Sequence, residues 1–178
     1  MKSSLIILLK DYSEKYPEEI NTVEAFNILL ENQDAFYRTC RPGHITVSGL
    51  ILNKQRTEVL LLKHRKLGIW VQPGGHSDGE EDTEKTARRE IEEETGLIRL
   101  NGGGPVLDLD IHPIPERPGE SSHYHYDVRF LFTAQKDAEL VISSESTDLK
   151  WVKLSELTKY TKDISMLKLI EKAGADYS

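Results

Sequence analysis

Residues 73–97 read PGGHSDGEEDTEKTARREIEEETGL, and this stretch determines how the rest of the chain is interpreted. Residues 83–95 have the composition of a helix, and Gly96 directly after them is typical of a helix C-terminus. Acidic residues crowd the end of this predicted helix, where the helix dipole is already negative. Each such charge costs about 0.3–1 kcal/mol at low salt, so stability alone does not account for this composition.

Three of these glutamates share one face of the predicted helix. Glu90, Glu93 and Glu94 lie at positions i, i+3 and i+4, whereas Glu92 points away from them. Clustered carboxylates are the hard oxygen ligands that Mg²⁺ prefers, with waters and substrate phosphates completing its coordination shell. The alternative is a solvated acidic helix whose charges are balanced by basic neighbours. The helix alone leaves both interpretations open.

The loop ahead of the helix favours the metal site. Its turn at residues 73–75 contains two glycines, which permit a close approach of the backbone, and an acidic segment follows as far as Glu81. Arg89 is placed to fold back from the helix and form an ion pair with Glu81. The loop, the helix and the terminating Gly96 thus form one unit with predicted strands on both sides.

Residues 75–97 resemble the Nudix box at every specified position and spacing, namely Gly75, Glu81, Arg89, Glu90, Ile91, Glu93, Glu94, Gly96 and Leu97. One feature departs from the commoner loop, which carries a glycine directly before the first specified glutamate. Here Gly79 stands one place earlier and Glu80 intervenes. The resemblance covers about residues 43–160 and implies an α/β fold, the Nudix-type α/β/α sandwich with a mixed central sheet.

The resemblance also implies roles for individual residues of the box. It assigns a metal ion, Mg²⁺ with Mn²⁺ as a substitute, to the carboxylates of Glu90, Glu93 and Glu94 and the carbonyl of Gly75. Glu81, Arg89 and Gly96 would be structural. Catalysis would fall to Glu90 and Glu93, with Glu145 in a later loop as a further candidate for the base. An ordinary loop acid is the alternative interpretation of Glu145.

Residues 123–129 alternate strictly along a predicted strand, which places His123, His125, Asp127 and Arg129 on one face. Three interpretations stay open for this face: a transition-metal site, a wall of the substrate cleft, or a hydrogen-bonded structural surface. We expect His123, His125 and Arg129 to contact substrate. His76 in the box loop and Arg65 in a basic cluster ahead of it are further candidates. The other histidines, His44, His64 and His112, are interpreted as structural.

The chain divides at the break around Pro42. Residues 1–42 predict an N-terminal helical extension, in which Thr22 caps a second helix, and residues 43–178 predict the Nudix domain with a C-terminal helix. Strands are expected at residues 44–52, 58–63, 70–71, 106–111 and 123–134, with weaker candidates at 140–142 and 148–152.

Composition limits the class of protein and its partners. The chain has 178 residues, of which 38% are hydrophobic, and a net charge of -7, which argues against binding a nucleic-acid polymer. The apolar run at residues 5–9 is shorter than the roughly 7–15 residues of a secretion signal and the roughly 20 of a membrane span. The single cysteine, Cys40, excludes an intrachain disulfide and indicates a reducing cytoplasm. The apolar face of the extension predicts either a homodimer contact or a cap over the active site.

The leading functional hypothesis is a hydrolase acting on a small nucleotide substrate, a nucleoside diphosphate linked to another moiety, such as ADP-ribose or a nucleotide sugar. Pro113 beyond the box is similar in place to a proline of some relatives that cleave ADP-ribose, although it also ends a predicted strand. The alternatives are a nucleoside triphosphate pyrophosphohydrolase and a non-catalytic binding module with the same fold. An isomerase would need a suitably placed cysteine, and Cys40 ahead of the domain is a poor candidate.

Overall fold

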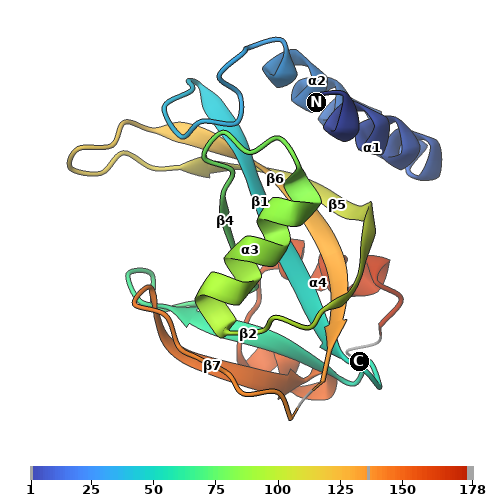
Figure 1. Ribbon diagram of the computed structural model, residues 1–178, viewed down its shortest axis with the longest axis vertical. Helices are drawn as coiled ribbons and strands as arrows, with labels where there is room; N and C mark the ends of the chain where they lie inside the picture. The colour runs from blue at the N-terminus through green and yellow to red at the C-terminus, as the bar shows by residue number, and fades with distance from the viewer. Residues whose placement is uncertain (1, 136, 176–178) are drawn as a thin grey trace.

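The computed structural model describes residues 2–135 and 137–175 (Figure 1). Its helices are α1 (Lys2–Lys15), α2 (Ile20–Leu30), α3 (Thr83–Thr95) and α4 (Ile164–Lys172), with the 3-10 helices η1 (Pro17–Glu19) and η2 (Leu154–Lys159). Its strands are β1 (Gly43–Asn53), β2 (Glu58–His64), β3 (Trp70–Val71), β4 (Gly74–His76), β5 (Asn101–Ile114), β6 (His123–Ala134) and β7 (Ser146–Lys153).

Strand β1 is the centre of the sheet. It pairs in parallel with β6 along its whole length, from Gly43 opposite Tyr124 to Asn53 opposite Ala134. Strand β5 adds to the outer edge of β6 in the antiparallel sense, and β2 and β4 pair antiparallel with β1. Strands β3 and β7 both pair with β2. The mixed central sheet predicted from the sequence is confirmed.

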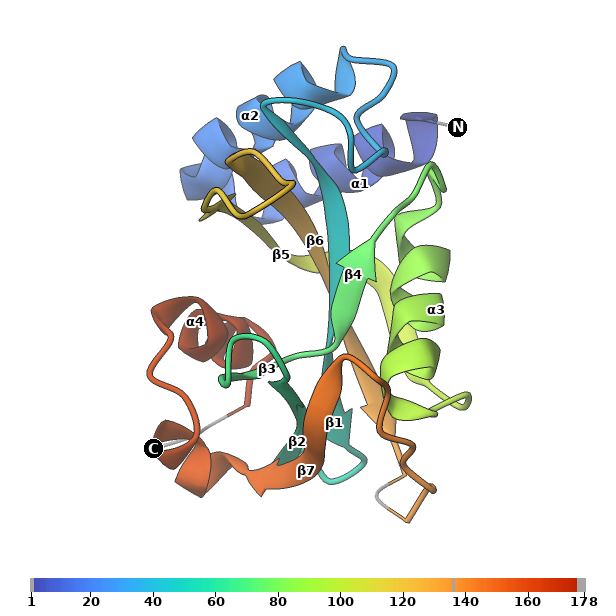
Figure 2. The same cartoon turned by 90° about the vertical axis from the view of Figure 1, so that its left-hand side faces the viewer.

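Alternate side chains of β1 enter two separate cores. Ile45, Val47 and Ile51 pack with residues of α3, whereas Leu50 and Leu52 pack with residues of η2 and α4. Figure 2 shows the sheet nearly edge-on, with α3 on one side and α4 on the other. This arrangement confirms the predicted α/β/α sandwich.

The N-terminal helices lie across the end of the sheet where β1 and β6 begin (Figures 1 and 2). Leu5 and Leu9 of α1 and Phe26 of α2 are fully buried in the same core as Ile45 and Phe130. The extension therefore shares the core of the domain, and the boundary between residues 42 and 43 stays a prediction.

Three local predictions are corrected by the structure. Thr22 is not a cap, because η1 runs directly into α2, which begins at Ile20 with no side-chain cap. Residues 140–142 form no strand, and Val141 and Ile142 are exposed there. Strand β5 extends past the predicted 106–111 and includes Pro113, which an edge strand tolerates.

Strand β4 forms where the sequence suggested only a turn. A Cβ on Gly74 would lie 2.3 Å from the carbonyl oxygen of Val47, so the glycine permits close pairing of β4 with β1. The pairing brings the start of the box loop onto the central strand. Among the described residues, no helix is long and apolar enough to cross a membrane.

Candidate active site

Helix α3 is held at both ends. Asp82 accepts a hydrogen bond from the backbone N–H of Lys85 at 3.0 Å, which caps the N-terminus. Gly96 ends the helix with a φ of 77°, and its N–H donates to the carbonyl of Glu92 at 2.8 Å. This left-handed conformation is unstrained for glycine, so the predicted helix and its terminating residue are confirmed.

Glu90 and Glu94 both point from α3 to the turn at Gly74 and Gly75. A carboxylate oxygen of Glu94 accepts the N–H of Gly74 at 2.9 Å. A Cβ built on Gly75 would lie 2.2 Å from Oε2 of Glu90, so this carboxylate rests directly on the glycine backbone. The Glu90 side chain is 13% exposed and Glu94 is 9% exposed. The two acids therefore share a partly buried position beside the backbone of β4.

Arg89 connects Glu90 to Glu93. Its Nη1 lies 2.8 Å from Oε1 of Glu90 and 3.1 Å from Oε1 of Glu93, and Nη2 donates to the carbonyl of His76 at 3.1 Å. The predicted ion pair between Arg89 and Glu81 is absent from the described part of the chain. Glu93, one helical turn away, takes that place, and its side chain remains 57% exposed.

The negative charge of the cluster is only partly compensated, since Arg89 pairs with Glu90 and Glu93 but no ion pair of the described residues reaches Glu94. Burial raises the pKa of Glu94 to about 7 against the opposing hydrogen bond from Gly74, and the charges of Glu90 and Glu145 raise it further. Burial also raises the pKa of Glu90, although Arg89 opposes this. A cation bound between these groups would compensate their charge. The donor set, carboxylates with a nearby backbone carbonyl, fits a hard divalent ion.

Gly75→Ala tests the close approach of the backbone to Glu90. The new methyl group would displace the carboxylate, the flexible end of a side chain, so we expect a small change in the thermal unfolding midpoint. Because small displacements of reacting groups are costly, we expect kcat to fall about ten- to hundredfold. Steady-state kinetics and thermal unfolding measure the two effects. Wild-type kcat in this variant would show that the position of Glu90 is unimportant.

The charge of Glu145 contributes to the raised pKa of Glu94, which connects the loop of Glu145 electrostatically with the glutamate cluster. Arg65 holds this loop in place. Its guanidinium donates to the carbonyls of Ser144 and Ser146, both at 2.8 Å, and its backbone N–H donates to the carbonyl of Glu145 at 2.8 Å. These bonds give Arg65 a part in positioning Glu145, while a contact with substrate stays a prediction.

Arg38 is a contributor to the box loop that sequence reasoning missed. It forms two hydrogen bonds with the carboxylate of Asp78, at 2.6 and 2.7 Å, and these lower the pKa of Asp78. The neighbouring N–H of Gly79 donates to the carbonyl of Phe36 at 3.0 Å. The segment between α2 and β1 thereby shapes the loop in which the unusual Gly79-Glu80 order occurs. Nothing in the local pattern around Arg38 signals this contact.

The two histidines of the predicted polar face, His123 and His125, lie beside His44 and His76 near the start of β1 and β6. The ring of His44 lies 4.9 Å from that of His123, 5.0 Å from that of His125 and 5.2 Å from that of His76, measured between centroids. Burial, followed by the charges of neighbouring rings, lowers the pKa of His44 to about 4 and that of His125 to about 2. Both rings are therefore neutral at pH 7.

Arg129, on the same face of β6, is enclosed by carboxylates. It lies 2.9 Å from Asp127, 3.0 Å from Asp110 and 3.4 Å from Asp108, and its side chain is 6% exposed. It also donates to the hydroxyl of Ser165 on α4 at 2.5 Å. This geometry gives Arg129 a structural role, while its predicted contact with substrate stays a prediction.

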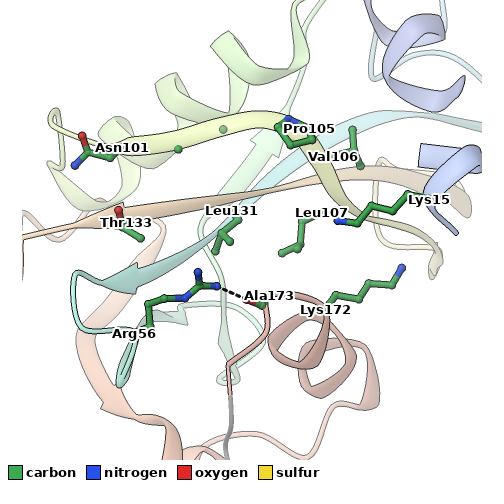
Figure 3. Close-up of a pocket in the computed structure, with 12 residues that line it drawn as sticks. Lys15, Arg56, Asn101, Pro105, Val106, Leu107, Leu131, Thr133, Lys172 and Ala173 are labelled. Atoms are coloured by element: carbon green, nitrogen blue, oxygen red, sulfur yellow. Dashed lines mark hydrogen bonds between the residues drawn. The ribbon is translucent and has the colours of Figure 1, made fainter. Parts of the chain in front are cut away.

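A cavity of about 430 Å³ lies between β5, β6 and the end of α4 (Figure 3). Lys15 and Lys172 stand on one side of it and Arg56 on the other, where its guanidinium donates to the carbonyl of Ala173. None of the box glutamates lines this cavity, and neither does Glu145. The cavity is therefore separate from the carboxylate cluster.

Comparison with known proteins gives one family match. The family model described as NUDIX domain matches residues 42–173. A putative 8-oxo-dGTP diphosphatase of Bacillus subtilis is 31% identical over 103 residues, which are 58% of this chain and 62% of that protein. This chain thus matches less than two thirds of the length of that relative.

Solved structures share the fold. A NUDIX-family hydrolase from Clostridium perfringens is 25% identical with a TM-score of 0.55, covering 73% of this chain and 94% of that one. The Ap4A hydrolase of C. elegans is 21% identical with a TM-score of 0.56, covering 73% and 94%. The NUDIX domain of Shewanella oneidensis NrtR, solved with ADP ribose, is 23% identical with a TM-score of 0.51, covering 85% and 96%.

Proposed function

Because the chain belongs to the NUDIX family, we propose that it hydrolyses the diphosphate linkage of a nucleoside diphosphate derivative, such as ADP-ribose or a nucleotide sugar. The proposed cofactor is Mg²⁺. The observation that carries the proposal is the pair of partly buried carboxylates, Glu90 and Glu94, held against the Gly74-Gly75 backbone. Keeping two acids in this partly buried position costs stability, and a protein without turnover has no need to bear that cost.

The carboxylates of Glu90, Glu93 and Glu94 would hold the metal, with the Gly75 carbonyl as a further ligand and Mn²⁺ as a substitute. When bound, Mg²⁺ neutralises phosphoryl oxygens and lowers the pKa of a water molecule. Arg89 would keep Glu90 and Glu93 oriented through the ion pairs described above. Glu81 and Gly96 would preserve the shape of the loop and the end of the helix.

Glu93 is the proposed base because its carboxylate is the exposed member of the cluster. It would take a proton from water as the water oxygen bonds to phosphorus. The bridging P–O bond then breaks and the leaving phosphate departs with the bridging oxygen. Glu145, on its exposed loop held by Arg65, is the second candidate for the same role.

Of the residues predicted to contact substrate, His76 and Arg65 are proposed to do so because their side chains remain accessible. The half-buried His125 directs its Nε2 to that of His123 at 3.3 Å, which disfavours direct contact. His123 and Arg129 are nearly enclosed, at 3% and 5% exposure, which disfavours direct contact. The name of the Bacillus subtilis relative supports a second candidate, hydrolysis of a nucleoside triphosphate. A non-catalytic binding module is the third.

The net charge of -7 supports a small nucleotide rather than a nucleic-acid polymer as partner. We place the protein in the cytoplasm on the strength of its single, buried cysteine. A homodimer contact through the N-terminal helices is supported by the exposed side chains of Ile6, Ile7 and Ile28.

A substrate panel with and without Mg²⁺ tests the proposal. ADP-ribose, nucleotide sugars and nucleoside triphosphates are incubated with the purified protein, and the phosphorylated products are resolved by chromatography. We expect Mg²⁺-dependent cleavage, with the highest kcat/KM for a diphosphate derivative. A higher kcat/KM for a triphosphate would select the second candidate, and no turnover of any compound would favour the binding module.

A further inference from the structure

Four histidines form a row across one face of the sheet at the end where β1 begins. The register pairs His44 of β1 with His125 of β6, and His125 with His112 of β5. His123 is on the same face of β6, two residues ahead of His125 in the chain. This row lies apart from the carboxylates of α3, which pack on the other side of the sheet.

Three of these rings bring one nitrogen atom each close together. One nitrogen from each of His44, His123 and His125 lies within 4.8 Å of the other two. Nε2 of His123 and Nε2 of His125 are 3.3 Å apart. Two nitrogen ligands at about 2.0–2.1 Å from a tetrahedral Zn²⁺ lie about 3.3–3.4 Å from each other. The observed separation is therefore that of two ligands sharing one ion.

His44 supplies an independent sign of a missing ligand. Its side chain is 1% exposed, yet neither ring nitrogen has a hydrogen-bond partner of good geometry among the described residues. The backbone of Cys40 contributes a hydrogen-bond interaction to the ring. An unsatisfied buried nitrogen costs free energy, and a bound cation would satisfy one of the two ring nitrogens.

The hydrogen bonding of His123 prepares it for the same role. Its Nδ1 donates to the carbonyl of Ser121 at 2.8 Å, so its Nε2 carries the free lone pair and faces His125. Metal-bound histidines are held in this way by a backbone carbonyl on the opposite ring nitrogen. The carboxylate of Glu120, 3.8 Å from the same Nε2, is a candidate for a fourth position.

We propose that His44, His123 and His125 bind a divalent transition-metal ion of the zinc type, with Glu120 or water as the fourth ligand. Imidazole nitrogens favour Zn²⁺ over Mg²⁺, which separates this site from the carboxylate cluster. The ion fixes the loop that carries Glu120 and Ser121 to the starts of β1 and β6. The ion would also lie near His76, whose ring is 5.2 Å from that of His44 and whose carbonyl accepts a hydrogen bond from Arg89. Through this contact the metal site would stabilise the loop that carries His76. The inference does not depend on the proposed hydrolysis.

Zinc titration of the metal-free protein against a chromophoric chelator tests the site, with Mg²⁺ in excess to occupy the carboxylates. We expect one equivalent of Zn²⁺ to bind, and Co²⁺ in its place to give the strong visible absorption of tetrahedral coordination. His125→Gln and His123→Gln should each weaken binding at least about tenfold. His64→Gln is the matched control, because His64 is at the end of β2 and does not belong to the row. Glu94→Gln is the control for the carboxylates. Both controls should bind Zn²⁺ as the wild type does.

The proposal is overturned if no stoichiometric Zn²⁺ binding occurs, or if Glu94→Gln abolishes binding that the histidine variants retain. In the first case the 3.3 Å contact is an ordinary hydrogen bond between two rings. Circular dichroism establishes that each variant is folded. If His123→Gln fails to fold, the His125→Gln variant, at a half-buried position, and the Co²⁺ spectrum of the wild type still test the site.

Discussion

Glu93→Gln is expected to lower kcat by about 10²–10⁴-fold at saturating Mg²⁺, the usual effect of losing a general base. The substitution keeps the size of the side chain and removes its charge. Because Glu93 is exposed and its only described ion pair is with Arg89, we expect little change in stability. Steady-state kinetics with the best substrate of the panel measures the effect.

Glu92→Gln is the matched control for this prediction, since Glu92 lies on the same helix and points away from the cluster. Its kcat should equal that of the wild type. Glu145→Gln separates the two candidate bases, because the larger loss of kcat identifies the group that takes the proton. Near-normal turnover in both Glu93→Gln and Glu94→Gln would refute a catalytic role for the cluster.

Arg129→Met is expected to destabilise the fold by about 3–5 kcal/mol, because it leaves Asp127 and Asp110 without the cation that they share. Asp108 keeps its ion pair with Lys172 at 2.7 Å. Asp108 and Asp127 are 1% and 5% exposed, and both lie within 3.4 Å of the guanidinium. Urea denaturation at pH 7 measures the difference in the free energy of unfolding. Arg99→Met, at an exposed position, is the control and should change stability by less than about 0.5 kcal/mol.

The pH dependence of this effect follows from Asp110. Burial favours its neutral form, but hydrogen bonding to His112 and the charge of Arg129 outweigh burial and lower its pKa to about 2. Its unfolded pKa is about 3.9, so its stabilising contribution is complete above that pH and is lost as the pH falls towards 2. The difference between wild type and Arg129→Met should therefore shrink below pH 4. A constant difference down to pH 2 would contradict this account.

The box was predictable because its signal is local. Its glutamates, Gly75 and Gly96 lie within one helix and its flanking turns, so spacing alone places the carboxylates on one face. The alternation of His123, His125, Asp127 and Arg129 was equally local, and β6 confirms that these side chains share a face.

What those side chains do depends on distant parts of the chain. His44 joins His125 only because β1 and β6 pair in parallel, and Asp108 reaches Arg129 through the register of β5. Arg38 reaches Asp78 from the segment that precedes β1. No pattern within a single segment predicts such pairings, since they arise from the topology of the sheet.

The predicted Arg89–Glu81 pair failed for a physical reason. A loop-to-helix contact must order the loop, whereas Glu90 and Glu93 lie within reach of Arg89 on the helix already formed. The nearer carboxylates therefore take the guanidinium. The structural role of Glu81 stays a proposal. The Gly75→Ala variant described above changes the other end of the same loop.

The most direct test of the central claim is Mn²⁺ binding to the carboxylate cluster, followed by the electron paramagnetic resonance signal of free Mn²⁺ during a titration. Mn²⁺ prefers oxygen ligands, and the measurement does not depend on knowing the substrate. The account predicts that Glu94→Gln weakens Mn²⁺ binding at least about tenfold, while Glu92→Gln binds as the wild type does. Equal affinity in Glu94→Gln and the wild type would contradict a metal site at Glu90, Glu93 and Glu94.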